Sequence, residues 1–288
     1  IMSIIAVSVM NAFALSATPK GPATIQFAWL WYQLPYGVIG VALSTALLTE
    51  MSEASAAEDW ETFRANVRLG LRSTIFLIIP LAAIIFTMSN QLAGLYHAGE
   101  FTYEDVLNVA RLVAVWCVAL PFYASYMFIY RIFSSMRELN RFIVIDAVGR
   151  VLLVVLYGFF TSGFGLIEGW EGLGLIGIPL ADACVYALLS AVMLFVLRRR
   201  IGSFGLTGVV IDGVKILVAA LLANALPFLI SFGDYDQTIF ISLVTVATCG
   251  AFALGVYYLF CRLFKVPETA LVNSLVLRIR GALRRGKS

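Results

Sequence analysis

The sequence predicts an all-α integral membrane protein, a polytopic helix bundle of about eight transmembrane helices. Composition is the first reason: 61% of the 288 residues are hydrophobic and only 13% are charged, whereas a soluble domain carries about 25% charged residues. The second reason is that long apolar runs recur along the chain, each near the about 20 residues that a helix needs to cross a bilayer. The third is that the loops between these runs are short.

Eight hydrophobic segments are expected to span the membrane. They cover residues 2–17, 24–48, 69–95, 107–131, 141–162, 173–197, 207–231 and 237–264. Together they form one transmembrane bundle, residues 1–264, and a basic amphipathic tail follows, residues 265–288. The sequence starts in apolar residues with no charged n-region and no small-residue cleavage site, so we expect a fragment rather than a signal peptide.

Basic residues gather in every second loop, and acidic residues gather in the loops between. Only Lys20 and Arg111 of the twenty basic residues fall among the acidic loops. The positive-inside rule therefore predicts that the basic loops and the C-terminus are cytoplasmic. The tail combines an apolar stripe with several arginines, which favours a helix lying on the anionic inner leaflet. It could instead lead into a further cytoplasmic domain.

The stretch 27–52 is long enough to span the membrane, but it is not uniformly apolar. Pro35 lies within it and should kink the helix. Small or polar residues recur at i, i+4, i+7 and i+11, which places them on one face of an α-helix: Gln33, Gly37, Gly40 and Ser44. Such a stripe either packs closely on a neighbouring helix or lines a cavity. The pattern alone leaves both interpretations open.

Three ionisable residues are expected within the membrane, where charge is costly and often functional. Asp146 and Arg150 are four residues apart with the acid first, the spacing that favours an ion pair on one helix. Asp182 has no such partner in its own helix, so it should point inward to a partner or to water. We interpret it as the candidate for an ion- or proton-sensitive residue.

Local patterns predict further details. Thr102 is a good N-cap, and Asp105 three residues later can complete a capping box that starts the fourth span. The third and fourth spans should then be antiparallel neighbours. The connector 52–73 is expected to form a short surface helix that runs into the third span. Tyrosines along the fourth span, at 123, 126 and 130, are interpreted as a membrane-interface belt.

No constellation for soluble catalysis is present. The sequence has no metal-ligand spacing, no G-x-S-x-G, no P-loop and no glycine-rich dinucleotide turn. We therefore expect no enzymatic activity, no cofactor, no metal and no nucleic-acid partner. A multi-span bundle with proline breaks, a polar stripe and a few buried charges is typical of a transporter.

One stretch carries a family resemblance. QLPYGVIGVALSTALL, residues 33–48, resembles the eighth transmembrane helix of the MurJ/MviN family, the lipid II flippases of bacterial cell-wall synthesis in the multidrug/oligosaccharidyl-lipid/polysaccharide exporter superfamily. Gly99, Phe101 and Thr102 match the family's G-x-F-T loop, and residues 131–138 resemble another family stretch. The span count fits family helices seven to fourteen, and the residues around Pro35 look most like actinobacterial members.

The resemblance implies the C-terminal lobe of a transporter in the bacterial cytoplasmic (inner) membrane. The function it implies is translocation of a lipid-linked peptidoglycan precursor, lipid II, by alternating access, together with the missing N-terminal lobe. The stripe at 33–44 would line the central cavity, and the spans 207–231 and 237–264 would form a groove for the polyprenyl tail. Membrane lipids and cell-wall synthesis or division proteins are further expected partners.

The chain also departs from the family pattern. Many members carry an Asp-Arg pair shortly before the proline of this helix, and the matching positions here are Trp29 and Leu30. The cationic contact to the lipid pyrophosphate is therefore absent from this helix. Two alternatives stay open: a related exporter of polysaccharide precursors or drugs, and a non-transporting membrane scaffold for cell-wall synthesis.

Overall fold

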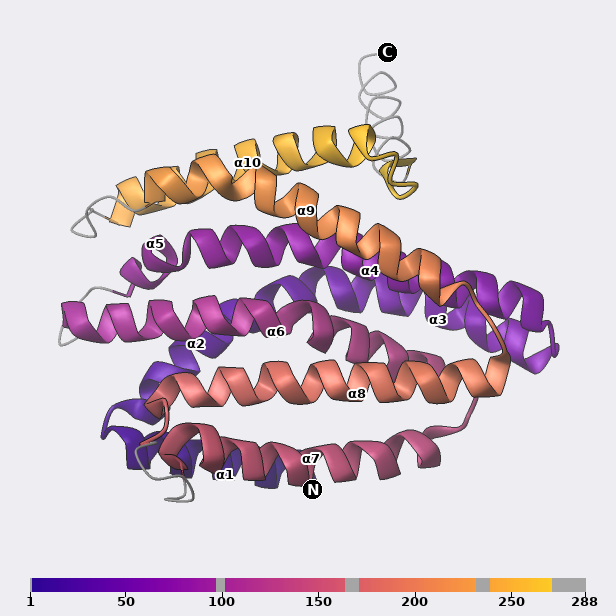
Figure 1. Cartoon of the computed structure of the whole chain (residues 1–288), viewed down its shortest axis with the longest axis horizontal. Coiled ribbons are helices and arrows are strands. Elements are labelled where there is room, and N and C mark those ends of the chain that lie inside the picture. The colour runs from indigo at the N-terminus through magenta and orange to yellow at the C-terminus, as the bar shows by residue number, and fades with distance from the viewer. Residues whose placement is uncertain (1, 97–101, 164–170, 232–238, 271–288) are drawn as a thin grey trace, which may run out of the picture.

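The computed structural model describes residues 2–96, 102–163, 171–231 and 239–270, and within them all regular structure is helical (Figure 1). Seven helical segments in this part of the chain are long and apolar enough to cross a membrane. The first helix, α1 (Met2–Ala17), has 16 residues and is shorter than a full span. The predicted membrane bundle is therefore confirmed, with seven spanning-length segments and one short helix instead of eight spans.

The elements follow one another along the chain with short connections. After α1 they are α2 (Gly21–Pro35), the π-helical turn η1 (Tyr36–Gly40), α3 (Val41–Ala56), α4 (Trp60–Thr87), α5 (Ser89–Gly94), α6 (Tyr103–Ser135), α7 (Leu139–Ser162), the 3₁₀ turn η3 (Gly174–Ile176), α8 (Gly177–Ile201), α9 (Leu206–Ser231) and α10 (Ile239–Leu263).

The predicted connector helix is not a separate element. Its first residues extend α3 to Ala56, and its later residues extend α4 back to Trp60, because both have the alanine and charged residues that favour helix. Asp59 caps α4 by accepting a hydrogen bond from the backbone N–H of Thr62 at 3.1 Å. Hydrogen bonds from the hydroxyl and the backbone of Thr62 lower the pKa of Asp59.

Helix α6 lies in the middle of the bundle. It packs against α2, α3, α4, α5, α7 and α8 (Figure 1). Its largest buried side chains include Trp116, Phe128 and Phe133. α4 runs antiparallel beside α6, as predicted, and Gly70 permits the close approach, since a Cβ at that position would lie 2.0 Å from Cζ of Phe128.

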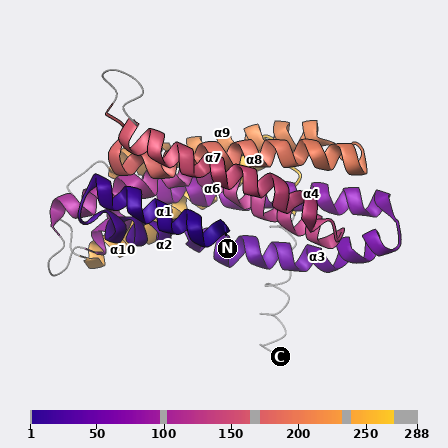
Figure 2. The same cartoon turned by 90° about the horizontal axis from the view of Figure 1, so that it is seen from below.

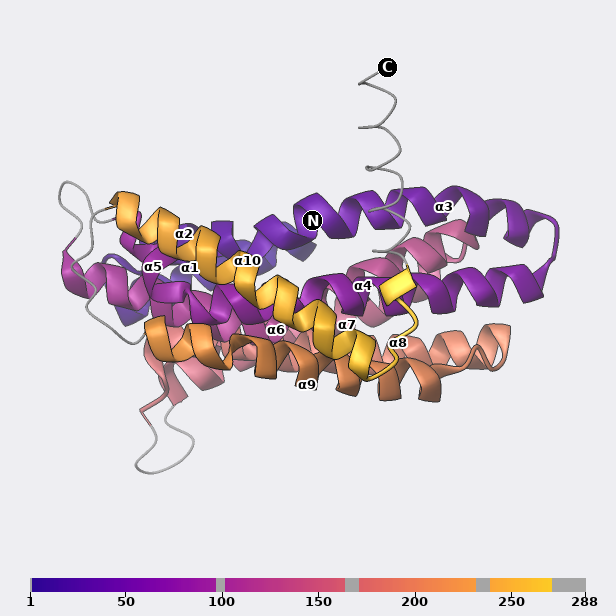
Figure 3. The ribbon, with the colours of Figure 1, turned by 90° about the horizontal axis from the view of Figure 1, so that it is seen from above.

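Helices α9 and α10 form a smaller second core on α4. The hydroxyl of Tyr257 in α10 donates a hydrogen bond to the carbonyl oxygen of Phe76 in α4 at 2.8 Å. Arg72 in α4 pairs with Asp212 in α9 and, at 2.6 Å, with Glu268 just after α10. α8 and α9 lie on one side of the molecule, and α2 and α3 lie on the opposite side (Figures 2 and 3).

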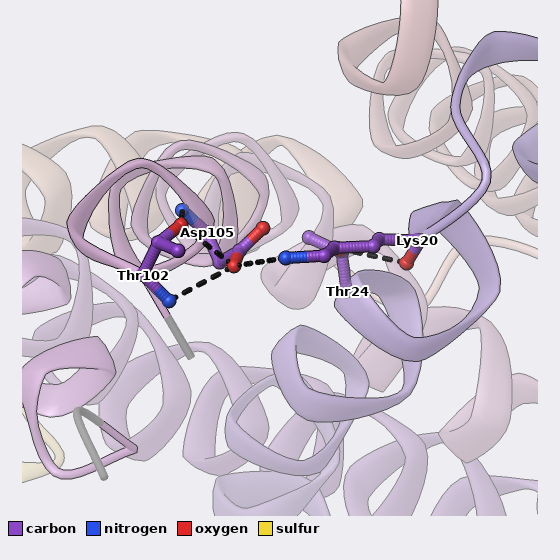
Figure 4. Close-up of polar contacts among 4 residues, drawn as sticks. All are labelled: Lys20, Thr24, Thr102 and Asp105. Carbon is purple, nitrogen blue, oxygen red and sulfur yellow. Dashed lines mark hydrogen bonds and ion pairs between the residues drawn. The ribbon is translucent and has the colours of Figure 1, made fainter. Parts of the chain in front are cut away.

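The start of α6 carries the predicted capping box. The Thr102 hydroxyl accepts from the backbone N–H of Asp105, and the Asp105 carboxylate accepts from the backbone N–H of Thr102 at 2.9 Å. The same carboxylate also binds the ammonium of Lys20 at 2.7 Å (Figure 4). Lys20 is one of the two basic residues outside the basic loops. Its ion pair with Asp105 links the turn before α2 to the start of α6. Gly99, Phe101 and most of the tail, residues 271–288, lie outside the described residues.

Candidate functional site

A polar cavity of about 400 Å³ lies beside the central helix, enclosed by α1, α2, α6, α7 and α8. All three ionisable residues singled out from the sequence border it: Asp146, Arg150 and Asp182. Tyrosines from three helices also line it: Tyr123, Tyr126, Tyr130, Tyr157 and Tyr186. The sequence predicted these charges one by one, and the fold brings them to a single cavity.

The predicted ion pair within α7 is confirmed. Nε of Arg150 lies 3.2 Å from Oδ1 of Asp146, one helical turn earlier. The same Oδ1 accepts a 2.6 Å hydrogen bond from the hydroxyl of Tyr126 in α6. The carboxylate is therefore neutralised from its own helix and held in place from the neighbouring one.

The guanidinium of Arg150 is bound on several sides. It donates to the hydroxyl of Tyr186 at 3.3 Å and to that of Tyr126 at 3.4 Å. It also lies 5.7 Å and 6.0 Å from the centroids of these two rings, within reach of cation–π attraction. One acid and two tyrosines thus stabilise a charge that would otherwise be costly at this depth.

Asp182 on α8 is almost wholly buried, with 1% of its surface exposed. The indole N–H of Trp116 donates to its Oδ2 at 2.7 Å, and the hydroxyl of Tyr157 donates to its Oδ1 at 2.7 Å. Within the described residues no basic side chain forms an ion pair with it. The prediction that Asp182 points inward to a partner is confirmed, and the partners are two neutral donors from α6 and α7.

Aromatic rings and aliphatic side chains, including Met10, Met127 and Leu153, form the rest of the cavity wall. Tyr123 and Tyr126 are buried, so the interpretation of these two as interface-belt residues is wrong; their face of α6 turns toward α2 and α8. The Tyr123 ring lies 5.1 Å from that of Tyr186 and 5.1 Å from that of Tyr36 in η1. Trp29 lines the same cavity. The only signal in the sequence for Tyr186 is its place one turn after Asp182.

The small and polar stripe of the second span is divided between two surroundings. Gln33 and Gly37 are exposed, and a Cβ at Gly37 would meet no atom within 4 Å. Gly40 is buried, and a Cβ there would lie 2.4 Å from Cδ2 of Tyr36. Ser44 lies in α3, and its side chain is outside the described part.

The π-helical turn explains this division. A π turn closes with i→i+5 hydrogen bonds, so it shifts the register that the i, i+4, i+7 spacing assumed. Residues on one face before Pro35 therefore continue on another face after Gly40. Around Gln33 and Gly37 the neighbouring exposed side chains are apolar: Leu30, Leu34, Val38 and Val41. The cavity-lining role of the stripe stays a prediction.

The described residues hold no cluster of three or more histidine, cysteine, aspartate or glutamate side chains placed to bind a metal. The cavity charges are instead bound to tyrosines, a tryptophan and each other. What the site can do chemically is hold a fixed pattern of charge at membrane depth. It can also rearrange that pattern if α7 or α8 moves relative to α6.

Comparisons with known proteins agree with this fold. The family model described as "Lipid II flippase MurJ" matches residues 1–250. Among curated relatives, the lipid II flippase MurJ of Thermosipho africanus is 27% identical over 187 residues, covering 60% of this chain and 38% of its own. The probable lipid II flippase MurJ of Synechocystis is 22% identical over 270 residues, covering 91% of this chain and 49% of its own.

A solved structure has the same fold. The one titled "Lipid II flippase MurJ, inward closed conformation" matches with a TM-score of 0.70 and 22% identity, covering 94% of this chain and 53% of that chain. The chain thus spans about half the length of that protein and half or less of these relatives. It is a multi-pass inner-membrane protein. With most of its length matched by the family model, the chain belongs to the lipid II flippase MurJ family.

Proposed function

We propose that the protein to which this chain contributes translocates lipid II, the lipid-linked peptidoglycan precursor, across the cytoplasmic membrane by alternating access. The observation that carries this proposal is the family match over residues 1–250, which the fold of the solved relative supports. In this proposal the chain supplies the C-terminal lobe, and the other half of the protein supplies the facing lobe.

A polar headgroup needs a path that avoids hydrocarbon, because an unpaired charge in the membrane costs several kcal/mol or more. α2, η1 and α3 form one continuous helical segment, Gly21–Ala56, which we call the α2–α3 rod. This rod offers the candidate wall for the path. Gln33 and Gly37 are exposed on it, and the open space at Gly37 leaves room for a bulky headgroup. The leucine at position 30 is 60% exposed and carries no charge. A cationic grip on the pyrophosphate would therefore come from the facing lobe.

The buried charges suggest how translocation is coupled to an ion or proton. Asp182 is the residue to which we assign this role, because only neutral donors hold its carboxylate. Replacing it with asparagine keeps the size and removes the charge. We expect the Asp182→Asn variant to lose the pH dependence of transport. Transport that follows the wild-type pH profile would reject the assignment.

The distribution of charge supports a proposal for the orientation of the chain and for the side on which partners dock. We propose that the basic ends of the helices and the C-terminus are cytoplasmic, with the Lys20–Asp105 pair on the outer side. On the basic side, Arg64 donates to the carbonyl oxygen of Ile201 at 3.0 Å and Arg200 pairs with Glu138 at 2.7 Å. This basic surface is where cell-wall synthesis or division proteins would dock.

Leu30 favours one alternative. Because the resemblance places an arginine at this position in many family members, an exposed leucine there would suit a scaffold that no longer transports. A related exporter with a different substrate would also tolerate it.

Depletion of the full-length protein distinguishes these functions. A flippase predicts that depleted cells accumulate lipid II and stop building wall, and that the intact gene restores both. A scaffold predicts division defects with lipid II translocation unchanged. Depleted cells that grow with normal wall and normal lipid II levels would reject the flippase.

A further inference from the structure

A second hollow, of about 820 Å³, borders α6 and α8 on their other face, where α4 and α9 complete the wall. Its lining is apolar except for Cys117 and four uncharged polar residues: Thr87, Ser125, Ser190 and Asn224. Several lining side chains, including Val118, Phe122 and Leu221, are exposed. The hollow is therefore a groove open to the surroundings of the bundle, and we call it the α8–α9 groove.

The groove runs along most of a membrane span. The α9 residues that line it extend from Leu206 to Phe228. At 1.5 Å per residue this is about 33 Å of helix, close to the about 30 Å of a bilayer's hydrocarbon core. Each leaflet makes up half of that core. The apolar wall therefore has room for an extended acyl chain in the half of the groove that lies in the chain's own leaflet.

The hydroxyls in the wall are already satisfied by the protein. Ser125 donates to the carbonyl oxygen of Pro121 at 2.8 Å, and Ser190 donates to that of Phe122 at 3.0 Å. Thr87 donates to the carbonyl oxygen of Ala83 at 2.8 Å. The amide nitrogen of Asn224 donates to the carbonyl oxygen of Ala220, which leaves its Oδ1 as the one unpartnered polar side-chain atom among the described lining residues. A single acceptor and no charge do not suit a sugar or peptide headgroup.

One end of the groove is basic. Arg68 lies one turn before the lining residue Leu71 in α4, and a Cβ at Gly205 would lie 3.4 Å from its Cδ. Arg198 lies one turn after the lining residue Leu194 in α8. Both arginines are exposed.

The nearby acid does not cancel these charges. Asp212 of α9 pairs with Arg72 and lies 3.4 Å from Lys215. Arg68 and Arg198 therefore remain available to a phosphate at the membrane surface, where each basic residue contributes to binding of anionic lipid.

The groove and the proposed translocation path lie on different sides of the bundle. α8 and α9 lie on the opposite side of the molecule from α2 and α3, as seen from below in Figure 2 and from above in Figure 3. A chain bound between α8 and α9 would therefore be separate from the path along Gln33 and Gly37.

We propose that the α8–α9 groove binds an anionic phospholipid from the leaflet at the basic end of the helices. One acyl chain lies in the half of the groove next to that end, and the phosphate lies at Arg68 and Arg198. This inference depends on the fold and the charges, and it holds whatever molecule the protein transports.

The test measures lipid retention by the purified full-length protein. Native mass spectrometry compares phosphatidylglycerol with phosphatidylcholine of the same chains. The wild type should retain phosphatidylglycerol roughly tenfold to thirtyfold better. The Arg68→Gln/Arg198→Gln variant should lose this preference, and Arg111→Gln, at the opposite end of α6, should keep it. Equal retention of the two lipids by the wild type, or an unchanged preference in the double variant, would overturn the proposal.

A second variant tests the groove itself. Ala191→Phe, from the groove wall, should fill the space and lower phosphatidylglycerol retention while the lipid-free melting temperature stays unchanged. Val148→Phe on α7, at a position 67% exposed, is the matched control and should retain lipid normally. A lowered melting temperature with unchanged lipid retention would show that another part of the protein covers the groove, and would also overturn the proposal.

Discussion

The polar cavity and the α8–α9 groove share two helices, yet their walls differ completely. On α6, Tyr123 and Tyr126 face the cavity while Phe122 faces the groove. On α8, Asp182 and Tyr186 face the cavity, and the next positions turn alanine and leucine to the groove. α6 and α8 therefore each present polar side chains to the cavity and apolar side chains to the groove.

The two walls show where a membrane protein can keep charged side chains. In the cavity, α6 and α7 supply the donors, so that Asp146 and Asp182 each have two partners. The described groove wall has no charged side chain, and its hydroxyls bond to nearby backbone. Costly buried charges are usually retained for function, so the cavity is the part of this lobe that we expect to respond to ions or to movement.

The largest expected effect comes from breaking the Asp146–Arg150 pair. Arg150→Met should lower the free energy of unfolding by about 3–5 kcal/mol, because it leaves a buried carboxylate without its cation. Asp146→Leu/Arg150→Met should recover most of the loss. Denaturant titration of the purified protein measures both. A single variant that loses less than about 1 kcal/mol would show that water already compensates the charge.

A smaller loss is expected at Asp182. Asparagine can accept a hydrogen bond with only one of its side-chain atoms, so Asp182→Asn leaves Trp116 or Tyr157 without its acceptor. The expected cost is about 1–3 kcal/mol in the same titration. Tyr157→Phe added to Asp182→Asn should cost little more. Full additivity of the two changes would mean that the residues are not coupled.

Two glycines of the second span test the aromatic wall of the cavity. Gly40→Ala forces the added methyl into the Tyr36 ring, which packs on Tyr123, and should cost about 1–3 kcal/mol. Gly37→Ala meets open space and should change stability by less than about 1 kcal/mol, with helix propensity favouring alanine. Equal melting temperatures for the two variants would contradict this difference between the positions.

The smallest effect is expected at the groove. Asn224 donates to the carbonyl oxygen of Ala220 in its own helix, and its Oδ1 has no hydrogen-bond partner among the described residues. Asn224→Leu should therefore change the free energy of unfolding by no more than about 0.5 kcal/mol or stabilise slightly. The one bond lost goes to a carbonyl oxygen that keeps its helical backbone hydrogen bond, and the unpartnered Oδ1 is removed. A loss above about 1 kcal/mol would reveal a partner in the rest of the protein and weaken the contrast with the cavity.

Features that depend on local geometry could be predicted from the sequence. The capping box at Thr102 and the ion pair of Asp146 with Arg150 each involve residues three or four positions apart, so helix geometry alone brings them together. The all-helical membrane class likewise follows from composition, because lipid leaves the backbone few other ways to satisfy its hydrogen bonds.

Features that depend on packing between helices could not be predicted. Nothing in the sequence around Asp182 indicates that Trp116, 66 residues away, donates to it. Tyr126 could be a belt residue or an interior residue, and only the rotation of α6 decides which. The π turn at Tyr36–Gly40 changed the register of the stripe, because spacing rules assume an uninterrupted α-helix.

Thiol accessibility of the α2–α3 rod in the full-length protein tests the proposed translocation path most directly. Cysteine at Gln33 or Gly37 should react with an aqueous, membrane-impermeant reagent from at least one side of the membrane, because the proposal places both in a water-filled path. Cysteine at Val148, on the exposed apolar face of α7, is the control that should stay unreactive. If Gln33, Gly37, Gly40 and Ser44 are all unreactive in every conformation of the protein, this rod faces lipid or protein, and the proposed path is wrong.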